Sequence, residues 1–426
     1  MATAKFSKGR NAPGQFCHVS EMHINVLRSC PVCGHARCEI LRKQRFVLPD
    51  GHPLAGGYAV VCCDLCGFVY AGTAVSQDDY DRFYREHSKY EDTTTSTGGG
   101  DTPWDDVRLH ETARCIAEFL PDRAARVLDI GCANGGLLRH LAALGFGHLT
   151  GLDPAAACVQ HTRSIAGIRA EMGSLSHIPA GLGTFDFVIL SHVLEHVQDL
   201  HGAVAAVAQV LSASGTVYVE VPDATRYAEH VPAPFQDFNT EHINHFSLTA
   251  LANLMHVAGM QVVSQGVKTL MAPPPNPYPA CFAFFRRGGS VQAQFAKDPV
   301  LRRKILEYIE ISTGKLHAMD EFLRAALPAD QPVIVWGVGQ LAMRLLAESV
   351  LGTASIAAFV DGNPIHHGRF IRGVRVSAPE GLAALPHPIL IASTLHDAEI
   401  TATIRQKLGL KNRIIHLGVP TPSQEQ

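Results

Sequence analysis

The sequence predicts an α/β protein with two doubly wound units and a cysteine-rich segment in front of them. Residues 127–136 and 333–342 each read as a buried strand, a glycine-containing loop and an amphipathic helix. Strand-like and helix-like runs alternate after both, which is typical of parallel sheets covered by helices. Four of the cysteines in the first 75 residues form two C-x-x-C pairs, which indicates a separate small module.

Length and composition support this division. A chain of 426 residues is expected to hold two or three domains. The hydrophobic content of 46% and charged content of 18% are typical of a folded, soluble protein. The formal net charge of −3 argues against a nucleic-acid-binding surface. Because no signal peptide or membrane-spanning run is seen, we expect a cytoplasmic protein without membrane partners, whose cysteines are thiols or metal ligands.

Residues 1–75 are predicted to be a zinc-binding module. Two similar runs, Cys-Pro-Val-Cys-Gly and Cys-Asp-Leu-Cys-Gly, supply four thiolates from Cys30, Cys33, Cys63 and Cys66. Four sulfurs suit tetrahedral zinc and leave no open position, so the expected role of the zinc is structural. A glycine after each pair lets the chain turn sharply behind the second sulfur.

Several alternatives stay open for this module. Cys62 adjoins Cys63 and is a rival ligand, and the thiols can also be inert and buried. A nucleic-acid-binding ribbon is disfavoured because no aromatic residues are interleaved with the basic ones. Further candidate ligands are Cys17, His18, His23 and Cys38.

Residues 76–110 are interpreted as a linker and arm. Tyr80, Phe83, Tyr84 and Tyr90 lie among charges over 76–92, which predicts a helix with one aromatic side. The Thr- and Gly-rich stretch 93–103 reads as a loop, either a lid or a plain linker.

Residues 111–290 are predicted to form the core that carries the chemistry. Gly131 and Gly135 leave room for the backbone to approach a ligand, in front of a helix N-terminus. Asp153 follows about twenty residues later at the tip of the second strand, where an acid can bind ribose hydroxyls. Ser174 is expected near a base, and further strands are predicted at 184–190 and 217–222.

This core resembles the class I S-adenosylmethionine-dependent methyltransferases. The shared pattern is an acid and glycines in the first loop, an acid on the second strand and an aspartate opening the fourth: Asp129, Gly131, Gly135, Asp153 and Asp186. The resemblance implies a Rossmann-like core whose first loop wraps the methionine end, with Asp153 on the ribose, Ser174 near adenine and His192 beside the cofactor. A dinucleotide site is the alternative, but the loop has no G-x-G-x-x-G and Asp129 would repel a pyrophosphate.

The run 238–247 supplies candidate catalytic groups. Glu241, His242 and His245 can place an imidazole and a carboxylate in one cleft, and histidine suits proton abstraction near neutral pH. Alternatively, these residues brace the helix that begins near Ser247.

The whole layout resembles the three-domain, zinc-containing sugar C-methyltransferases that act on nucleotide-linked 4-keto deoxysugars. Glu241 and His242 match the Glu-His of the family's Tyr-x-Glu-His motif, in which the histidine is the proposed base, but Asn239 replaces the tyrosine. The resemblance also implies roles for His196 and for Tyr84 or Tyr90.

Residues 291–426 are predicted to form a second, smaller α/β domain. Gly337, Gly339 and Ala342 loosely match a dinucleotide fingerprint, with Asp361 as the acid. Three interpretations remain: binding of the nucleotide part of a substrate, which the resemblance favours, binding of a dinucleotide, or a scaffold or dimer surface.

We therefore expect an enzyme that transfers methyl groups from S-adenosylmethionine to a nucleotide-linked sugar or related small metabolite. C-methylation of a keto sugar would use His242 as the base, whereas O- or N-methylation would need only deprotonation of a hydroxyl or amine. The rival from another class is a non-catalytic scaffold that binds S-adenosylmethionine or a nucleotide. The sequence leaves the oligomeric state open.

Overall fold

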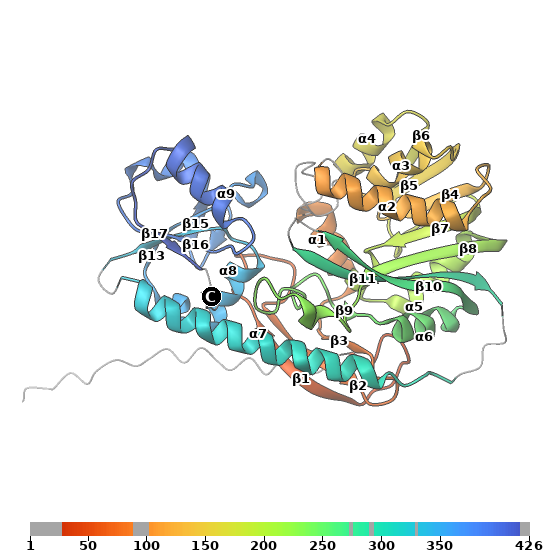
Figure 1. Ribbon diagram of the computed structural model, residues 1–426, viewed down its shortest axis with the longest axis horizontal. Helices are drawn as coiled ribbons and strands as arrows, with labels where there is room; N and C mark the ends of the chain where they lie inside the picture. The colour runs from red at the N-terminus through yellow and green to blue at the C-terminus, as the bar shows by residue number, and fades with distance from the viewer. Residues whose placement is uncertain (1–27, 88–101, 272–275, 289–293, 329–330, 418–426) are drawn as a thin grey trace, which may run out of the picture.

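The computed structural model describes residues 28–87, 102–271, 276–288, 294–328 and 331–417. Within these ranges the chain forms three sheets, of seven, six and four strands. Figure 1 shows the seven-stranded and six-stranded sheets in separate halves of the molecule, with the long helix α7 (Pro299–Ala326) running beneath both. The two predicted glycine loops therefore lie in different halves.

The seven-stranded sheet is the predicted central core. Its strand order is β10-β11-β8-β7-β4-β5-β6, and β11 is antiparallel to its neighbours β8 and β10. The strands predicted near 127, 148, 184, 217, 261 and 281 are confirmed. The strands span β4 (Arg126–Ile130), β5 (His148–Asp153), β6 (Ile168–Met172), β7 (Phe185–Ser191), β8 (Leu211–Pro222), β10 (Met260–Met271) and β11 (Pro277–Arg287).

Both faces of this sheet are buried, which explains why its central strands are continuous apolar runs. Val127 and Ile189 belong to the apolar cluster under α2 and α3, whereas Leu128 and Leu190 belong to the cluster under α5 and α6. Figure 1 shows these helix pairs on opposite sides of the sheet. The helices are α2 (Pro103–Phe119), α3 (Gly136–Ala143), α4 (Ala156–Ser164), α5 (Leu200–Val210) and α6 (Leu248–Val257).

The four-stranded sheet joins the cysteine-rich segment to the core. Its order is β1-β2-β3-β9, in which the two-residue strand β9 (Asn244–His245) comes from the core and pairs with Val69 and Tyr70. The Arg28 guanidinium reinforces this junction by donating to the backbone oxygens of Ala71 and Ile243. The other strands are β1 (Cys38–Arg45), β2 (Gly57–Cys63) and β3 (Val69–Gly72).

The predicted aromatic helix of the arm is confirmed as α1 (Gln77–His87), in which Tyr80 and Phe83 are buried. The loop predicted at 93–103 and Tyr90 lie largely outside the described residues, and the next helix, α2, already begins at Pro103.

The six-stranded sheet forms the C-terminal domain, in the order β14-β15-β13-β12-β16-β17. The strands predicted near 333, 357, 389 and 413 and the helix predicted over 296–327 are confirmed. The elements are β12 (Val333–Trp336), α8 (Gln340–Glu348), β13 (Ile356–Val360), β14 (Phe370–Ile371), β15 (Val374–Ser377), β16 (Ile389–Ile391), α9 (Asp397–Ala402) and β17 (Ile414–His416). None of the helices in the described part of the chain combines the length and apolar character that a membrane span requires.

Candidate active site and cysteine cluster

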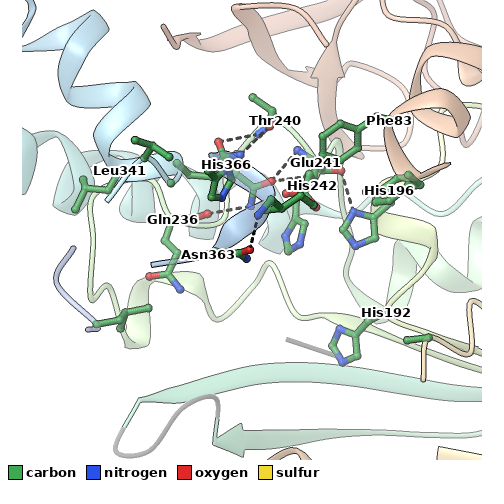
Figure 2. A pocket seen from close by; sticks show the side chains of 18 of the residues that line it. Phe83, His192, His196, Gln236, Thr240, Glu241, His242, Leu341, Asn363 and His366 are labelled. Carbon is green, nitrogen blue, oxygen red and sulfur yellow. Dashed lines mark hydrogen bonds between the residues drawn. The ribbon is translucent and has the colours of Figure 1, made fainter. Parts of the chain in front are cut away.

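A single cleft of about 1440 Å³ connects the two glycine loops. Its lining runs from Gly131 and Asp153 of the core, past Glu241 and His242, to Gly337 of the C-terminal domain. Figure 2 shows the middle of this cleft, where His196 and His242 of the core lie near Asn363 and His366 of the C-terminal domain. The structure thus brings together residues that the sequence places in two domains.

Asp153 fixes the conformation of the first glycine loop through its carboxylate. Its two carboxylate oxygens accept hydrogen bonds from the backbone N–H groups of Ala133 and Ala155, each at 2.9 Å. Gly131 has a φ of +79°, and a Cβ there would lie 2.8 Å from a methyl group of Val193. Only glycine combines this positive φ with the absence of a Cβ, so a ligand in the cleft can approach the backbone here.

Asp129 is the acid of this loop. Its side chain is only 3% exposed yet lines the cleft. Burial and the nearby charge of Asp153 raise the pKa of Asp129 to about 7. A neighbouring cation, such as the amino group of an amino acid, would stabilise the charged form of this buried carboxyl.

The remaining predicted cofactor residues differ in position. Ser174 lines the cleft and its hydroxyl lies 2.7 Å from that of Ser176. Gly135 is not part of the lining; it has a φ of +76° and caps α3, so its neighbour Gly136 faces the cleft instead. Asp186 accepts from the backbone of Arg126 at the N-terminal edge of the sheet, away from the cleft, which is a structural role.

His192 sits at the end of β7 in a network that sequence reasoning missed. Its two ring nitrogens lie 3.2 Å from Glu195 Oε1 and 3.1 Å from Glu220 Oε1. Burial acts to lower the pKa of His192, but the hydrogen bonds and charges of these two glutamates outweigh it and raise the pKa. The backbone of His192 also has a φ of +56°, which is unusual for a non-glycine residue and is often found at functional sites.

Glu220 is fully buried within the apolar strand β8, where Lys268 and the hydroxyl of Tyr218 also contact it. Although burial acts to raise the pKa of Glu220, Lys268 and His192 hold it well below its usual range. The available signal in the sequence was an acid inside a strand that is otherwise apolar, since such a group needs buried partners.

His196, Glu241 and His242 meet in the middle of the cleft. The rings of His196 and His242 are 4.8 Å apart, and Nδ1 of His196 lies 3.1 Å from the backbone oxygen of Glu241. The ring of Tyr84 from α1 lies 5.7 Å from His196 in an edge-on contact. Tyr84, one of the two tyrosines considered for the arm, therefore reaches the site; Tyr90 lies outside the described residues.

Asn239 shapes the turn that presents this pair. Its side-chain oxygen accepts from the backbone N–H groups of Glu241 and His242, each at 2.8 Å, and its own carbonyl accepts from the Tyr58 hydroxyl. An asparagine is suited to this local turn in a way that tyrosine is not. Asn239, at the position where the sugar C-methyltransferase motif has a tyrosine, therefore has a structural role in this chain.

His245 is not brought into the cleft. It belongs to β9, is fully buried, and lies against the rings of Phe238 and Tyr227. Burial and the charge of Arg28 lower the pKa of His245 to about 3. Pairing of β9 with β3 turns this side chain into the interior, so its position is that of a buried core histidine.

The four predicted cysteines form one cluster. Each of Cys30, Cys33, Cys63 and Cys66 offers a sulfur, and the four sulfurs lie within 4.8 Å of one another. Gly34 and Gly67 follow the two pairs with φ of +72° and +77°, which confirms the expected sharp turns. The donor set fits a tetrahedral, thiolate-bound ion such as zinc.

The rival ligands lie elsewhere. The sulfur of Cys62 faces the backbone oxygens of Cys63 and Gly67, at 3.8 and 3.6 Å, and is not in the cluster. Cys38 is also outside the cluster. Cys17, His18 and His23 lie outside the described residues.

The second glycine loop repeats the backbone scheme of the first. Asp361 accepts from the N–H groups of Val338 and Asn363, at 2.9 and 2.8 Å, and Gly337 has a φ of +98°. The surrounding cleft wall contains the cationic or protonatable side chains of His366, His367, Arg369, His396 and Lys407.

Comparison with known proteins supports the character of the core. Residues 105–265 match a family model described as a methyltransferase domain. The chain is 28% identical to ajmaline N-methyltransferase from Rauvolfia serpentina over 33% of its own length and 52% of that protein. It is 25% identical to the O-methyltransferase cnsE from Penicillium expansum over 54% of its own length and 83% of that protein.

A third curated relative is the ubiquinone biosynthesis O-methyltransferase of Aromatoleum aromaticum, 35% identical over 26% of this chain and 51% of that protein. The chain thus spans about half the length of two of these three relatives. Among solved structures, magnesium protoporphyrin IX methyltransferase from Synechocystis aligns with a TM-score of 0.40 and 15% identity, covering 50% of this chain and all of that one. Residues 105–265 of the chain therefore form a methyltransferase domain.

Proposed function

We propose that this protein transfers a methyl group from S-adenosylmethionine to a nucleotide-linked sugar or a related small metabolite. The observation that carries the proposal is the continuous cleft, which places the cofactor loop of the methyltransferase domain opposite a second nucleotide-type loop. Clefts between domains are common sites for ligands, and this one is large enough for a cofactor together with an acceptor.

The cofactor half of the cleft suits S-adenosylmethionine. Asp129 would supply a buried carboxylate for the amino group of the methionine part, and Asp153, at the tip of β5 in the cleft lining, would accept from the ribose hydroxyls. Ser174 would lie beside the adenine. Alignment of the methyl donor with the acceptor would supply much of the rate, because the cofactor already carries the reactive group.

The acceptor half suits an anionic, nucleotide-like group. Arg369 and Lys407 line the wall around the second glycine loop together with Glu380 and Glu399, and Lys407 lies 3.8 Å from Glu380. The loop itself lacks a carboxylate equivalent to Asp129. Phosphate oxygens would therefore be repelled less here than at the first loop, where the carboxylate of Asp129 lies. The reacting sugar would then reach toward Glu241 and His242 in the middle of the cleft.

His242 is our candidate for the base that activates the acceptor. On a keto sugar it would remove a proton α to the carbonyl, and the resulting enolate carbon would attack the methyl group. The O- and N-methyltransferases among the relatives support the alternative in which the nucleophile is a hydroxyl or an amine.

The test is calorimetry with S-adenosylmethionine, followed by turnover assays with radiolabelled cofactor on nucleotide-linked keto sugars and their hydroxyl analogues. We expect H242Q to bind the cofactor as the parent protein does and to lose turnover. Cofactor binding without a methylated product from any of these acceptors would favour the non-catalytic scaffold.

We also propose that Cys30, Cys33, Cys63 and Cys66 hold a structural zinc ion. The cluster lies next to α7, since the backbone N–H of Asp298 donates to the oxygen of Cys66 at 2.9 Å. Elemental analysis should find zinc in the parent protein and in C62S, whose sulfur is outside the cluster, and a strong loss of zinc in C63S. Equal zinc contents in C62S and C63S would contradict the assignment.

A further inference from the structure

A second group of metal-binding side chains lies inside the cleft. Glu195, His196 and His242 each offer one ligand atom, and the three atoms lie within 4.8 Å of one another. Glu195 and His196 follow β7 at the carboxyl edge of the sheet, and His242 comes from the turn shaped by Asn239. Figure 2 shows the rings of His196 and His242 beside one another, with His192 farther away.

The orientation of His196 presents a lone pair to this group. Its Nδ1 lies 3.1 Å from the backbone oxygen of Glu241, and because a carbonyl only accepts, Nδ1 carries the hydrogen. In the neutral ring the lone pair is then on Nε2, which lies 3.9 Å from Oε1 of Glu195, the oxygen that His192 also contacts. A histidine whose other nitrogen donates to a backbone carbonyl has the arrangement typical of metal ligands.

One carboxylate oxygen of Glu195 lacks a hydrogen-bond partner among the described residues. Its side chain is 1% exposed, and its Oε1 is held by His192 at 3.2 Å. Its Oε2 is buried and accepts no hydrogen bond from any residue that the structure describes. Leaving a buried carboxylate oxygen without a partner is costly, and a bound cation would remove that cost.

We propose that Glu195, His196 and His242 bind a divalent transition-metal ion at the centre of the cleft. Two imidazoles and one carboxylate are a common donor set for such ions and leave positions open to a substrate. Ligand atoms at about 2.1 Å from a tetrahedral metal are about 3.4 Å apart. Side-chain rotations that move the ligand atoms by roughly 1 Å would therefore bring them to coordination distance. The four-sulfur cluster has no such open position.

This inference rests on the proposed methyl transfer in its hydroxyl-acceptor form, and it replaces His242 as the base by a metal ion that coordinates the acceptor hydroxyl. Coordination lowers the pKa of the hydroxyl, which releases its proton to water. The oxygen lone pair then attacks the methyl carbon, and the electrons of the breaking S–CH₃ bond return to sulfur, giving a methyl ether and S-adenosylhomocysteine. While it binds the metal, His242 cannot also act as the base, so dependence of turnover on the metal distinguishes the two roles.

The binding test uses Mn²⁺ and the full-length protein after mild chelation, which leaves zinc in the cysteine cluster and the second site free of zinc. Mn²⁺ favours oxygen and nitrogen ligands over thiolates, so the cysteine cluster should not take it up. Paramagnetic resonance of free Mn²⁺ should reveal one bound equivalent, and E195Q and H242Q should each weaken binding at least about tenfold. The matched controls are H317Q and E321Q, from an exposed His-Glu pair on α7, which should bind as the parent protein does.

Cofactor binding by calorimetry checks that E195Q and H242Q remain folded. Parent protein that takes up no Mn²⁺, or equal binding by E195Q, H242Q and the controls, would overturn the metal site. Turnover is then measured after mild chelation that leaves the zinc of the cysteine cluster in place. Loss of turnover that Mn²⁺ restores supports the inference, whereas unchanged turnover in protein without the second metal overturns it and leaves methyl transfer intact. Mn²⁺ bound at the site without turnover on any acceptor would instead contradict the proposed function.

Discussion

The two glycine loops share one backbone arrangement and differ in charge. In each, an acid at the tip of the following strand holds two backbone N–H groups: Asp153 in the core and Asp361 in the C-terminal domain. In each, the first glycine has a positive φ and donates its N–H to the backbone of that same strand, to Leu152 or Val360.

The difference lies two residues before the glycine. The core has Asp129 at this place and the C-terminal domain has Val335. The first loop therefore offers a buried carboxylate in addition to its strand-tip acid, and the second does not; the wall around the second loop carries Arg369 and Lys407 together with Glu380 and Glu399. The shared hydrogen bonds build a loop that can approach a ligand, and the charge around the loop decides between a cationic and an anionic one.

The strongest test of this comparison removes each strand-tip acid. Both D153A and D361A lose the same two backbone hydrogen bonds, so damage to the loop itself is matched. We expect D153A to weaken S-adenosylmethionine binding at least about 100-fold, because the substitution both alters the loop and removes the carboxylate that would accept from the ribose hydroxyls. D361A should leave this affinity within about twofold and raise KM for the acceptor; calorimetry and steady-state kinetics measure both. Equal loss of cofactor affinity in the two variants would contradict a division of labour.

A somewhat smaller effect is expected for D129N. Loss of a charge-assisted contact to the amino group of the cofactor should lower its affinity about 10- to 100-fold. Because the free carboxyl has a pKa of about 7, parent affinity should also fall as the pH drops from 7.5 to 5.5, by up to about tenfold per unit below 7. Over that range the α-amino group of the cofactor stays largely protonated. Calorimetry across this pH range should show that cofactor affinity depends much less on pH in D129N than in the parent protein. An equal pH dependence in the two proteins would contradict a contact between Asp129 and the cofactor.

The same carboxyl should reduce the stability of the free protein. Its folded pKa of about 7 is above the unfolded value of 3.8, so the folded state binds more protons between these values. Stability from this group is therefore present below about pH 4 and is lost as the pH rises through 7. At pH 8 we expect D129N to raise the free energy of unfolding by roughly 2 kcal/mol without cofactor. Denaturant unfolding of both proteins at pH 5 and pH 8 measures this, and a lower stability of D129N at pH 8 would contradict it.

The core was predictable because its signals are local. Apolar runs ending at Asp129 or Asp153 identify the strands and place their acids at one edge of the sheet. The two C-x-x-C-G runs likewise carry their own turn chemistry, so the cluster of four sulfurs follows from spacing alone.

What the sequence could not show depends on contacts between distant segments. Strand β9 has only two residues and exists because it pairs with β3, and this pairing buries His245 while His242 stays in the cleft. Similarly, Glu220 meets Lys268 only after β11 inserts between β8 and β10. The sequence pattern around His245 or Glu220 contains no information about which distant segment will pack against it.

The smallest effect in the comparison concerns the two positive-φ glycines. Alanine is disfavoured at both by about 1 kcal/mol because of the backbone conformation. At position 131 the new Cβ would also lie 2.8 Å from Val193, whereas at 337 its nearest neighbour would be the Ala392 oxygen at an ordinary 3.5 Å. We therefore expect G131A to lower the free energy of unfolding by more than G337A and to weaken cofactor binding, and G337A to cost only about 1 kcal/mol. Thermal unfolding and calorimetry of the two variants measure this, and a larger loss for G337A would show that the second loop is the more tightly packed of the two.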